Sequence, residues 1–221
     1  MFGSSLDASQ LFQALYETLY MVTVALVIGA LIGIPLGILL VVTRKNGIWQ
    51  NLVLHQILNP IINILRSIPF IILLIAIVPF TKLLVGTSIG TTAAIVPLTV
   101  YVAPYIARLV ENSLLEVDDG IIEAAKAMGA SPLQIIRYFL LPEALGSLIL
   151  AITTAIIGLI GSTAMAGAVG GGGIGDLALV YGYQRFDTMV IIITVIVLII
   201  IVQVIQSLGC LLYTSPSPRD R

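Results

Sequence analysis

The chain has 221 residues, of which 59% are hydrophobic and 10% are charged, and its formal net charge is -1. An ordinary soluble domain is roughly half apolar and about a quarter charged, so this composition excludes a single soluble core. A near-neutral chain also lacks the long-range field that attracts nucleic acid, and no nucleic-acid partner is expected. With one cysteine (Cys210) and one histidine (His55), no internal disulfide and no clustered Cys/His metal site are expected.

Uncharged stretches mark the expected membrane spans, because a helix needs about 20 mostly apolar residues to cross a ~30 Å hydrocarbon layer. Four stretches are long enough, namely residues 18–43, 83–107, 144–175 and 188–208. The segment between Arg66 and Lys82 is too short alone, so a fifth span is expected to begin around residues 54–59, with a kink at Pro69. The sequence thus predicts an all-α membrane protein with five transmembrane helices.

Small residues predict where these helices touch. In lipid there is no hydrophobic drive between helices, so residues that let two backbones approach closely contribute much of the packing. Gly29, Gly33 and Gly37 supply such a face in the first span, and Gly158 and Gly161 supply one in the fourth. We expect both sets to be helix contacts.

The end of the chain is predicted to be foreign. Residues 210–220 are CLLYTSPSPRD, which resembles the translated read-through of a common sequencing-library adapter. We therefore expect residues 210–221 to be an adapter-derived artefact and leave them out of fold reasoning. The alternative is a genuine Ser/Pro-rich tail.

The basic residues predict the orientation, because Lys and Arg collect on the cytoplasmic side of a membrane. Five spans place six of them on one side: Arg44, Lys45, Arg66, Arg108, Lys126 and Arg137. Lys82 and Arg185 fall on the other side. We expect the N-terminus outside the cell and the C-terminus in the cytoplasm.

The stretch between the third and fourth spans, residues 108–143, is too polar to cross the membrane. Asp118 and Asp119 can cap a helix that begins near Gly120, and Gly129 is suited to end it in the left-handed conformation. The sequence therefore predicts one short helix on the cytoplasmic surface.

A second short helix is predicted to follow at once. Ser131 as N-cap, Pro132 at the first helical position and Gln134 three residues after the cap form the pattern of a capping box. Pro142 is expected to break this helix before the next span. The two helices together form a cytoplasmic helix-turn-helix that could dock a partner.

The same stretch resembles the EAA signature of permeases in ATP-binding-cassette importers. The matching residues are Glu123, Ala124, Ala125, Gly129, Leu141 and Pro142. Phe139 departs from the pattern, because isoleucine is more usual there. The resemblance implies that this loop couples the membrane helices to a separate ATPase subunit. In that role Glu123 would be a polar contact to the ATPase, Ala124 and Ala125 would allow close approach, and Gly129 would form the turn.

Further runs narrow the resemblance to the permease subunits of methionine importers. They are RSIPFIILL (66–74), VGTSIG (85–90), AAIVPLTV (93–100) and EAAKAMGA (123–130). The resemblance covers nearly all of a permease domain at residues 11–209. It implies a homodimer in the bacterial plasma membrane, two ATPase subunits that use ATP and Mg²⁺, and an external substrate-binding lipoprotein. It also implies import of methionine, in both the L and D forms.

Other functions stay open. A GxxxxGK[ST] phosphate loop, paired carboxylates and a Ser/His/Asp grouping are all missing from the sequence of the spans, so no enzymatic activity and no bound cofactor are expected of the chain itself. The alternatives are a permease for another polar amino acid, an ion-coupled carrier, and a membrane enzyme. The last two would need titratable residues inside the spans.

A few residues are candidates for the gate or pathway. Arg66 is either a gating residue or a helix-end contact whose charge reaches the membrane surface. Ser162, Thr163 and Met165, near the outer end of the fourth span, could line a path for a thioether amino acid. The run of glycines at 170–173 is either a hinged external gate or a flexible connector.

Overall fold

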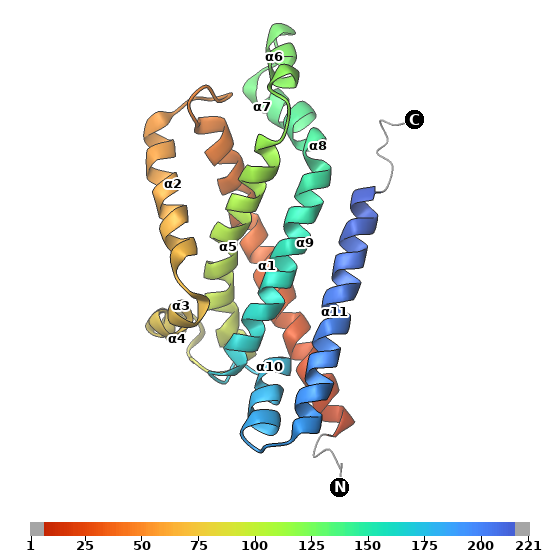
Figure 1. Cartoon of the computed structure of the whole chain (residues 1–221). Coiled ribbons are helices and arrows are strands. Elements are labelled where there is room, and N and C mark those ends of the chain that lie inside the picture. The colour runs from red at the N-terminus through yellow and green to blue at the C-terminus, as the bar shows by residue number, and fades with distance from the viewer. Residues whose placement is uncertain (1–6, 215–221) are drawn as a thin grey trace.

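The computed structural model describes residues 7–214, and the regular structure in that part of the chain is helical. Among the described residues, four helices are long and apolar enough to cross a membrane: α1 (Ala8–Thr43), α5 (Thr91–Leu115), α9 (Leu145–Gly167) and α11 (Thr188–Thr214). A fifth span is formed if α2 (Leu52–Ser67) and α3 (Phe70–Ala76) count as one, although a 99° bend separates them. The predicted all-α membrane fold is confirmed, and the long helices extend lengthwise through the bundle, with α1 crossing obliquely behind α5 and α9 (Figure 1).

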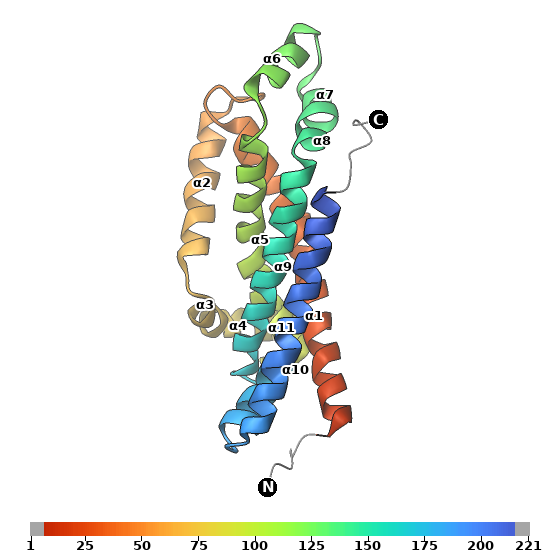
Figure 2. The ribbon, with the colours of Figure 1, turned by 45° about the vertical axis from the view of Figure 1, so that its right-hand side comes forward.

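Short helical segments connect the long helices. They are α4 (Val78–Val85), α6 (Asp119–Ala127), α7 (Pro132–Ile135), α8 (Leu141–Glu143) and α10 (Gly173–Leu177), with π-helical turns at η1 (Ile136–Leu140) and η2 (Ala178–Tyr183). The α6 and α7 helices lie at the end of the bundle opposite the first turn of α1, whereas α10 lies near that first turn (Figure 2). One end of the bundle therefore carries the α6 and α7 helices, and the other end carries α10.

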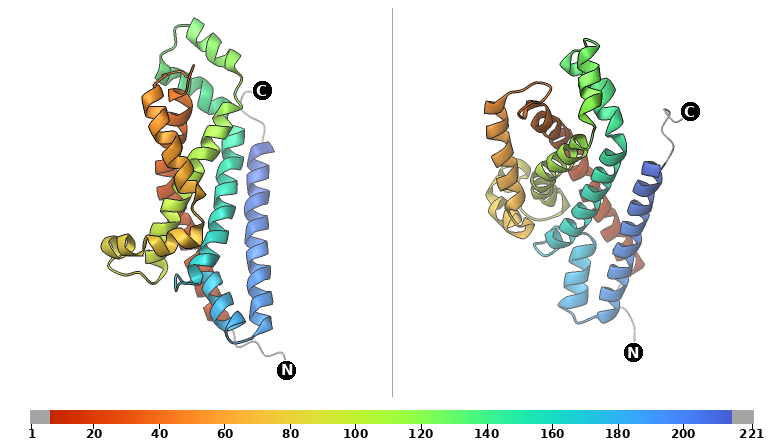
Figure 3. Two further views of the ribbon diagram at one scale, coloured as in Figure 1. Left: turned by 60° about the vertical axis from the view of Figure 1, so that its left-hand side comes forward. Right: turned by 45° about the horizontal axis from the view of Figure 1, so that its top comes forward.

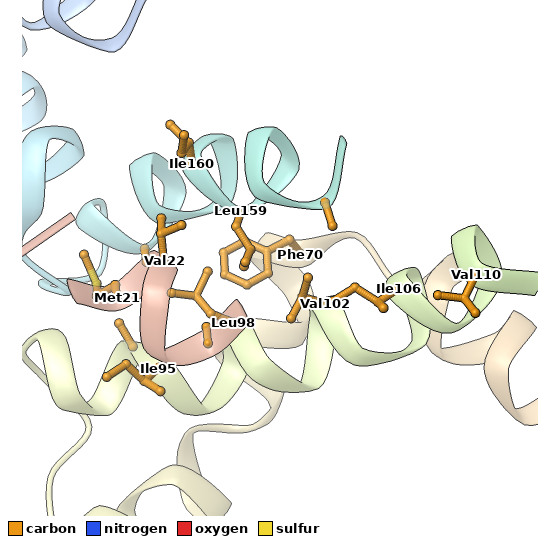
Figure 4. Packing of buried hydrophobic residues seen from close by; sticks show 14 of the residues in the cluster. Met21, Val22, Phe70, Ile95, Leu98, Val102, Ile106, Val110, Leu159 and Ile160 are labelled. Atoms are coloured by element: carbon orange, nitrogen blue, oxygen red, sulfur yellow. The ribbon is translucent and has the colours of Figure 1, made fainter. Parts of the chain in front are cut away.

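The main apolar core lies between α1, α5 and α9. Leu98, Val102 and Ile106 follow one face of α5 at intervals of four residues, and all three are fully buried. Phe70, from the start of α3, and Leu159 of α9 pack into the same cluster (Figure 4). The beginning of α3 is thereby fixed to the centre of the bundle.

The predicted contact face of α1 is confirmed. A Cβ atom at Gly33 would lie 2.5 Å from the Ala103 carbonyl oxygen, and one at Gly37 would lie 2.6 Å from that of Ala107. Both distances are too short for any side chain, so glycine lets α1 lie directly on the α5 backbone. The prediction for α9 was wrong at Gly161, where a Cβ would meet no described atom within 4 Å.

The predicted third span, residues 83–107, was misplaced. Residues 78–85 form α4 instead, and α5 begins at Thr91 after Gly86 and Gly90, both of which have positive φ. At its other end α5 continues through Arg108 to Leu115. The charge at Arg108 marked a boundary wrongly, because Glu111 of the same helix pairs with it.

The position of Arg66 also differs from the prediction. Arg66 lies in the last turn of α2, whereas Arg44 precedes that helix, and 16 helical residues span about 24 Å. The two arginines therefore lie at opposite ends of α2 and not on one side. Pro69, expected to kink a continuous span, instead stands at the break before α3, which turns away from the bundle axis with α4 (Figure 3).

The last helix, α11, continues through residues 210–214, and residues 215–221 of the segment predicted to be foreign lie outside the described residues. A helical backbone over five residues does not distinguish native from adapter-derived sequence. The origin of this segment stays a prediction.

Candidate functional site: the α6–α7 hairpin

The α6–α7 hairpin joins α5 to α9, the two helices that flank the core. Asp118 caps α6 by accepting a hydrogen bond from the Gly120 N–H at 2.7 Å, as predicted. Gly129 ends the helix with φ of +78°, and the Ala130 N–H donates to the Ala125 carbonyl at 3.1 Å across the turn. The predicted cap and the predicted turn are both confirmed.

The start of α7 also agrees with the sequence. Pro132 occupies the first turn, and the Ser131 N–H donates to the Gln134 side chain at 2.8 Å, as a capping box requires. The predicted break before the next span lies at Ala144, two residues after Pro142, where α8 ends and α9 begins. The Leu141 N–H donates to the Ile136 carbonyl across a π-helical turn, so Pro142 falls in the first turn of α8, where it needs no donor.

The hairpin has an inner and an outer side. Ala125, Ile135 and Leu140 are at most 1% exposed and face the bundle. The outer side, which we call the tip surface, consists of exposed residues on either side of the turn: Glu123, Ala124, Ala127, Met128 and Leu133. Met128 and Leu133 are 69% and 73% exposed. Two large apolar side chains are thus exposed beside a charged one at this end of the bundle.

A groove of about 410 Å³ separates α6 from the turn that follows α1. Arg44 from that turn reaches Asp119 of α6 at 3.6 Å, and Glu123 and Lys126 line the same groove. Both partners of this ion pair are exposed, so it contributes at most about 1 kcal/mol. Within residues 7–214, no group of three His, Cys, Asp or Glu side chains is placed to hold a metal ion.

The candidate pathway residues are not brought together. Ser162 and Thr163 are buried, and their hydroxyl groups donate to carbonyls of their own helix, those of Gly158 and Ile160. Met165, on the same helix, is 51% exposed, and Arg66 is exposed on α2. The role of these four residues stays a prediction.

The glycine run is an anchored turn. Gly170, Gly172 and Gly173 have φ near +80°, which other residues rarely adopt. The Gly173 N–H donates to the Glu17 carboxylate at 2.8 Å, and the Gly170 carbonyl accepts from the Gly90 N–H at 2.8 Å. This conformation does not support the prediction of a flexible connector.

A charged residue follows the turn. Asp176 lies in α10 and, with Glu17, lines a hollow of about 240 Å³. Burial, and then the negative charge of Glu17, raise the pKa of Asp176 above its usual value of 3.8. The charged form of Asp176 is therefore disfavoured at this end of the bundle.

Sequence reasoning missed a group of four polar side chains between α2 and α5. Arg108 of α5 donates to Glu111 on its own helix and to both Asn59 and Asn63 of α2. Arg108 and Glu111 are three residues apart, and Asn59 and Asn63 are four apart, so each pair could have been recognised as one polar face of a helix. Nothing in the sequence could have shown that these faces meet.

Residues 33–214 match the family of binding-protein-dependent transport system inner membrane components. The chain belongs to this family. Among its members, the probable D-methionine transport system permease protein MetI of Vibrio cholerae is 52% identical over 171 residues, which cover 77% of this chain and 76% of that protein. The methionine import system permease protein MetP of Bacillus subtilis is 50% identical over 208 residues, or 94% of each chain.

Solved structures agree with this family membership. An inward-facing structure of the MetNI methionine ABC transporter contains a chain that superposes with a TM-score of 0.91 at 50% identity, over 93% of this chain and 95% of that one. An amino acid ABC transporter solved with histidines superposes with a TM-score of 0.75 at 20% identity, which shows a shared fold. The resemblance inferred from the EAA residues is thereby confirmed.

Proposed function

We propose that this chain is the membrane permease subunit of an ATP-binding-cassette importer and that it carries methionine into the cell. The observation that supports this most is the capped α6–α7 hairpin with Glu123, Ala124 and Ala125, at the end of a helical bundle that superposes on a MetNI chain with a TM-score of 0.91. Methionine appears in the names of relatives at 52% and 50% identity, one of them for the D form. Both stereoisomers are therefore proposed as substrates.

The proposed assembly contains two copies of this chain, two ATPase subunits and an external substrate-binding lipoprotein. A two-fold homodimer is the simplest way in which a thin bundle can enclose a path. ATP and Mg²⁺ would be bound by the ATPase subunits. Lipid would surround α11, whose outer side chains are apolar and exposed along its length.

The tip surface is proposed to dock on the ATPase. Glu123 and Ala124 are exposed, so the first would supply a polar contact and the second would permit close approach. Ala125 is fully buried, which favours a different role from the one that the resemblance implies: its small size lets α6 lie close to the bundle. Gly129 would hold the turn, and Leu141 and Pro142 would lead the hairpin into α9.

The hairpin end is proposed to face the cytoplasm, with the N-terminus outside. Four basic residues lie in the turn after α1 or in the hairpin: Arg44, Lys45, Lys126 and Arg137. Lys82 and Arg185 lie toward the other end. This distribution supports the orientation, because positive charge is retained on the cytoplasmic side.

The pathway is proposed to run along the outer face of α9. Met165 is exposed there, one turn from Gly161, and Gly161 leaves open space where a side chain would stand. Ser162 and Thr163 would support this face from behind. Arg66 would act as a gate only where a second copy of the chain approaches α2.

The test is uptake of labelled methionine into proteoliposomes that contain this chain, its ATPase and its binding protein. We expect uptake that requires ATP and that unlabelled L- or D-methionine reduces. Uptake that follows an ion gradient without ATP would instead identify an ion-coupled carrier. Competition by histidine or glutamine but not by methionine would contradict the substrate.

A further inference from the structure

We infer that Arg108, Glu111, Asn59 and Asn63 form a clamp that makes α2 move together with α5. Through this clamp, movement of the α6–α7 hairpin would reach the arm formed by α2, α3 and α4. The inference rests on the proposed function, because it assumes that a partner moves the hairpin. It adds four positioning residues, none of which belongs to the EAA signature.

The geometry of the clamp joins two helices through one guanidinium group. The Arg108 Nη2 atom lies 2.8 Å from the Asn59 Oδ1 atom and 2.6 Å from the Asn63 Oδ1 atom. The Nη1 atom donates to the Glu111 carboxylate one helical turn along α5. The side chains of Arg108 and Glu111 are 15% and 9% exposed. The guanidinium thus bridges a carboxylate on its own helix and two amides on the neighbouring one.

A charge in this position requires such partners. Arg108 lies seven residues, or about 10 Å, before the end of a membrane-spanning helix. An unpaired charge within the bilayer is costly, and removal of one member of a buried ion pair leaves the other without compensation. The Arg108 Nε atom is buried and has no partner among the described residues. The side chain is therefore held in place by its bonds to Glu111 and to α2.

Outside the clamp, α2 is held by a hydrogen bond of 3.1 Å between the His55 ring and the Leu40 carbonyl of α1 and by few apolar contacts. Of its described residues, Ile62 alone is fully buried, in a small cluster with Leu40 and Ala107. The opposite side of α2 exposes Val53, Ile57 and other apolar residues. Because lipid provides no hydrophobic drive between helices, a small apolar cluster holds α2 only weakly. The clamp is the specific polar link between α2 and α5.

The clamp also lies between the α6–α7 hairpin and the arm formed by α2, α3 and α4. The α5 helix ends at Leu115 and leads through three residues to α6, so any displacement of the hairpin acts on α5 first. The α2 helix leads at its far end into α3 and α4, which project sideways from the bundle (Figure 3). A link between α2 and α5 therefore joins the hairpin to this arm.

The test measures two distances in the assembled transporter, with ATPase and binding protein, in lipid nanodiscs. Exposed Cys210 is replaced by serine, and a spin label is placed either at Lys126→Cys in α6 or at Leu83→Cys in α4. In a homodimer each label gives one distance between the two copies. Pulsed EPR compares the nucleotide-free state with the ATP-trapped state, and we expect both distances to change in the parent protein.

Two variants remove the clamp. Asn59→Leu with Asn63→Leu keeps the ion pair but removes its bonds to α2, and Arg108→Met with Glu111→Met removes the charges without leaving one unpaired. We expect the α6 distance to change as in the parent and the α4 change to fall below half. Methionine uptake per ATP hydrolysed should drop about fivefold or more. Arg185→Met, at the opposite end of the bundle, is the control and should match the parent.

The exchange of Arg108→Glu with Glu111→Arg gives a rescue test. An asparagine amide both donates and accepts, so Asn59 and Asn63 can turn their amides toward a carboxylate. We expect this exchange to restore the α4 change. An α4 change of parent size in both clamp-free variants would overturn the inference alone. An α6 distance that does not respond to ATP in the parent protein would instead remove the proposed function, and the inference with it.

Discussion

Glu17 of α1 accepts a hydrogen bond at 2.8 Å from the Gly173 N–H, which lies 156 residues further along the chain. The next residue of each pair repeats the contact, since the Thr18 hydroxyl accepts from the Ile174 N–H at 2.9 Å. Together the two bonds hold the first turn of α10 against α1. The glycine turn is therefore part of the packed structure at this end of the bundle.

We predict that Glu17→Ala destabilises the protein by about 1–3 kcal/mol, because the buried Gly173 N–H loses its acceptor. Glu17→Gln should cost less, since its amide oxygen can still accept. The measurement is thermal unfolding in detergent. Gln13→Ala is the control, because Gln13 bonds Glu17 only at the exposed surface and should change little. Equal loss in the alanine variants of Glu17 and Gln13 would contradict the anchoring role.

The raised pKa of Asp176 predicts that the stability of the folded protein depends on pH. Burial and the neighbouring Glu17 raise the pKa of Asp176 in the folded protein above 3.8, its usual value. The folded state then holds the proton more tightly than the unfolded state, so stability is highest below pH 3.8 for this group and falls as the pH rises through the raised pKa. We expect Asp176→Asn to stabilise the protein at pH 7 and to show no gain at pH 3.5.

Thermal unfolding between pH 3.5 and pH 8 measures this difference. Asp7→Asn, an exposed carboxylate at the start of α1, provides the control and should follow the parent at each pH. A stabilisation by Asp176→Asn that is the same at every pH would show that the charge of Asp176 is not its cause.

Local signals explain which parts of the fold and site the sequence could predict. The cap at Asp118, the turn at Gly129 and the capping box from Ser131 to Gln134 each depend on residues at most five positions apart. Physical rules for such short segments are nearly independent of the rest of the protein. The glycine face of α1 was predictable for a related reason, because small residues in membrane helices commonly serve close contact between two helix backbones.

Long-range partners explain what the sequence could not predict. The cost of a lone charge in lipid predicts the end of a span at Arg108, but Glu111 and Asn63 satisfy the charge of Arg108 within the helix bundle. Asn63 lies 45 residues away, and only the folded chain reveals the contact. The four glycines were equally uninformative alone, since Gly173 is held by Glu17 and Gly170 by Gly90, both far away in the sequence.

The glycine face of α1 gives a matched pair of variants. Gly33→Ala would force α1 away from α5, because the added Cβ overlaps the Ala103 carbonyl. We expect a loss of about 1–3 kcal/mol, typical of overpacking, measured as a lower midpoint of thermal unfolding. Gly161→Ala is the control, because a Cβ there meets no described atom within 4 Å. If both variants unfold at the parent temperature, close approach of α1 to α5 does not contribute to stability.

Variants in the α6–α7 hairpin can test coupling to the ATPase separately from folding of the chain. Gly129 has φ of +78°, so Gly129→Val would strain the turn by about 1–3 kcal/mol and shift α7 relative to α6. Glu123→Lys would reverse a charge on the tip surface without changing the turn. We expect both variants to insert as membrane dimers, and ATP-dependent methionine uptake to fall tenfold or more. Gly129→Asn should keep most of the uptake, because asparagine tolerates the left-handed conformation. Uptake at the parent rate in both the valine and the lysine variants would exclude the hairpin as the contact through which the ATPase acts.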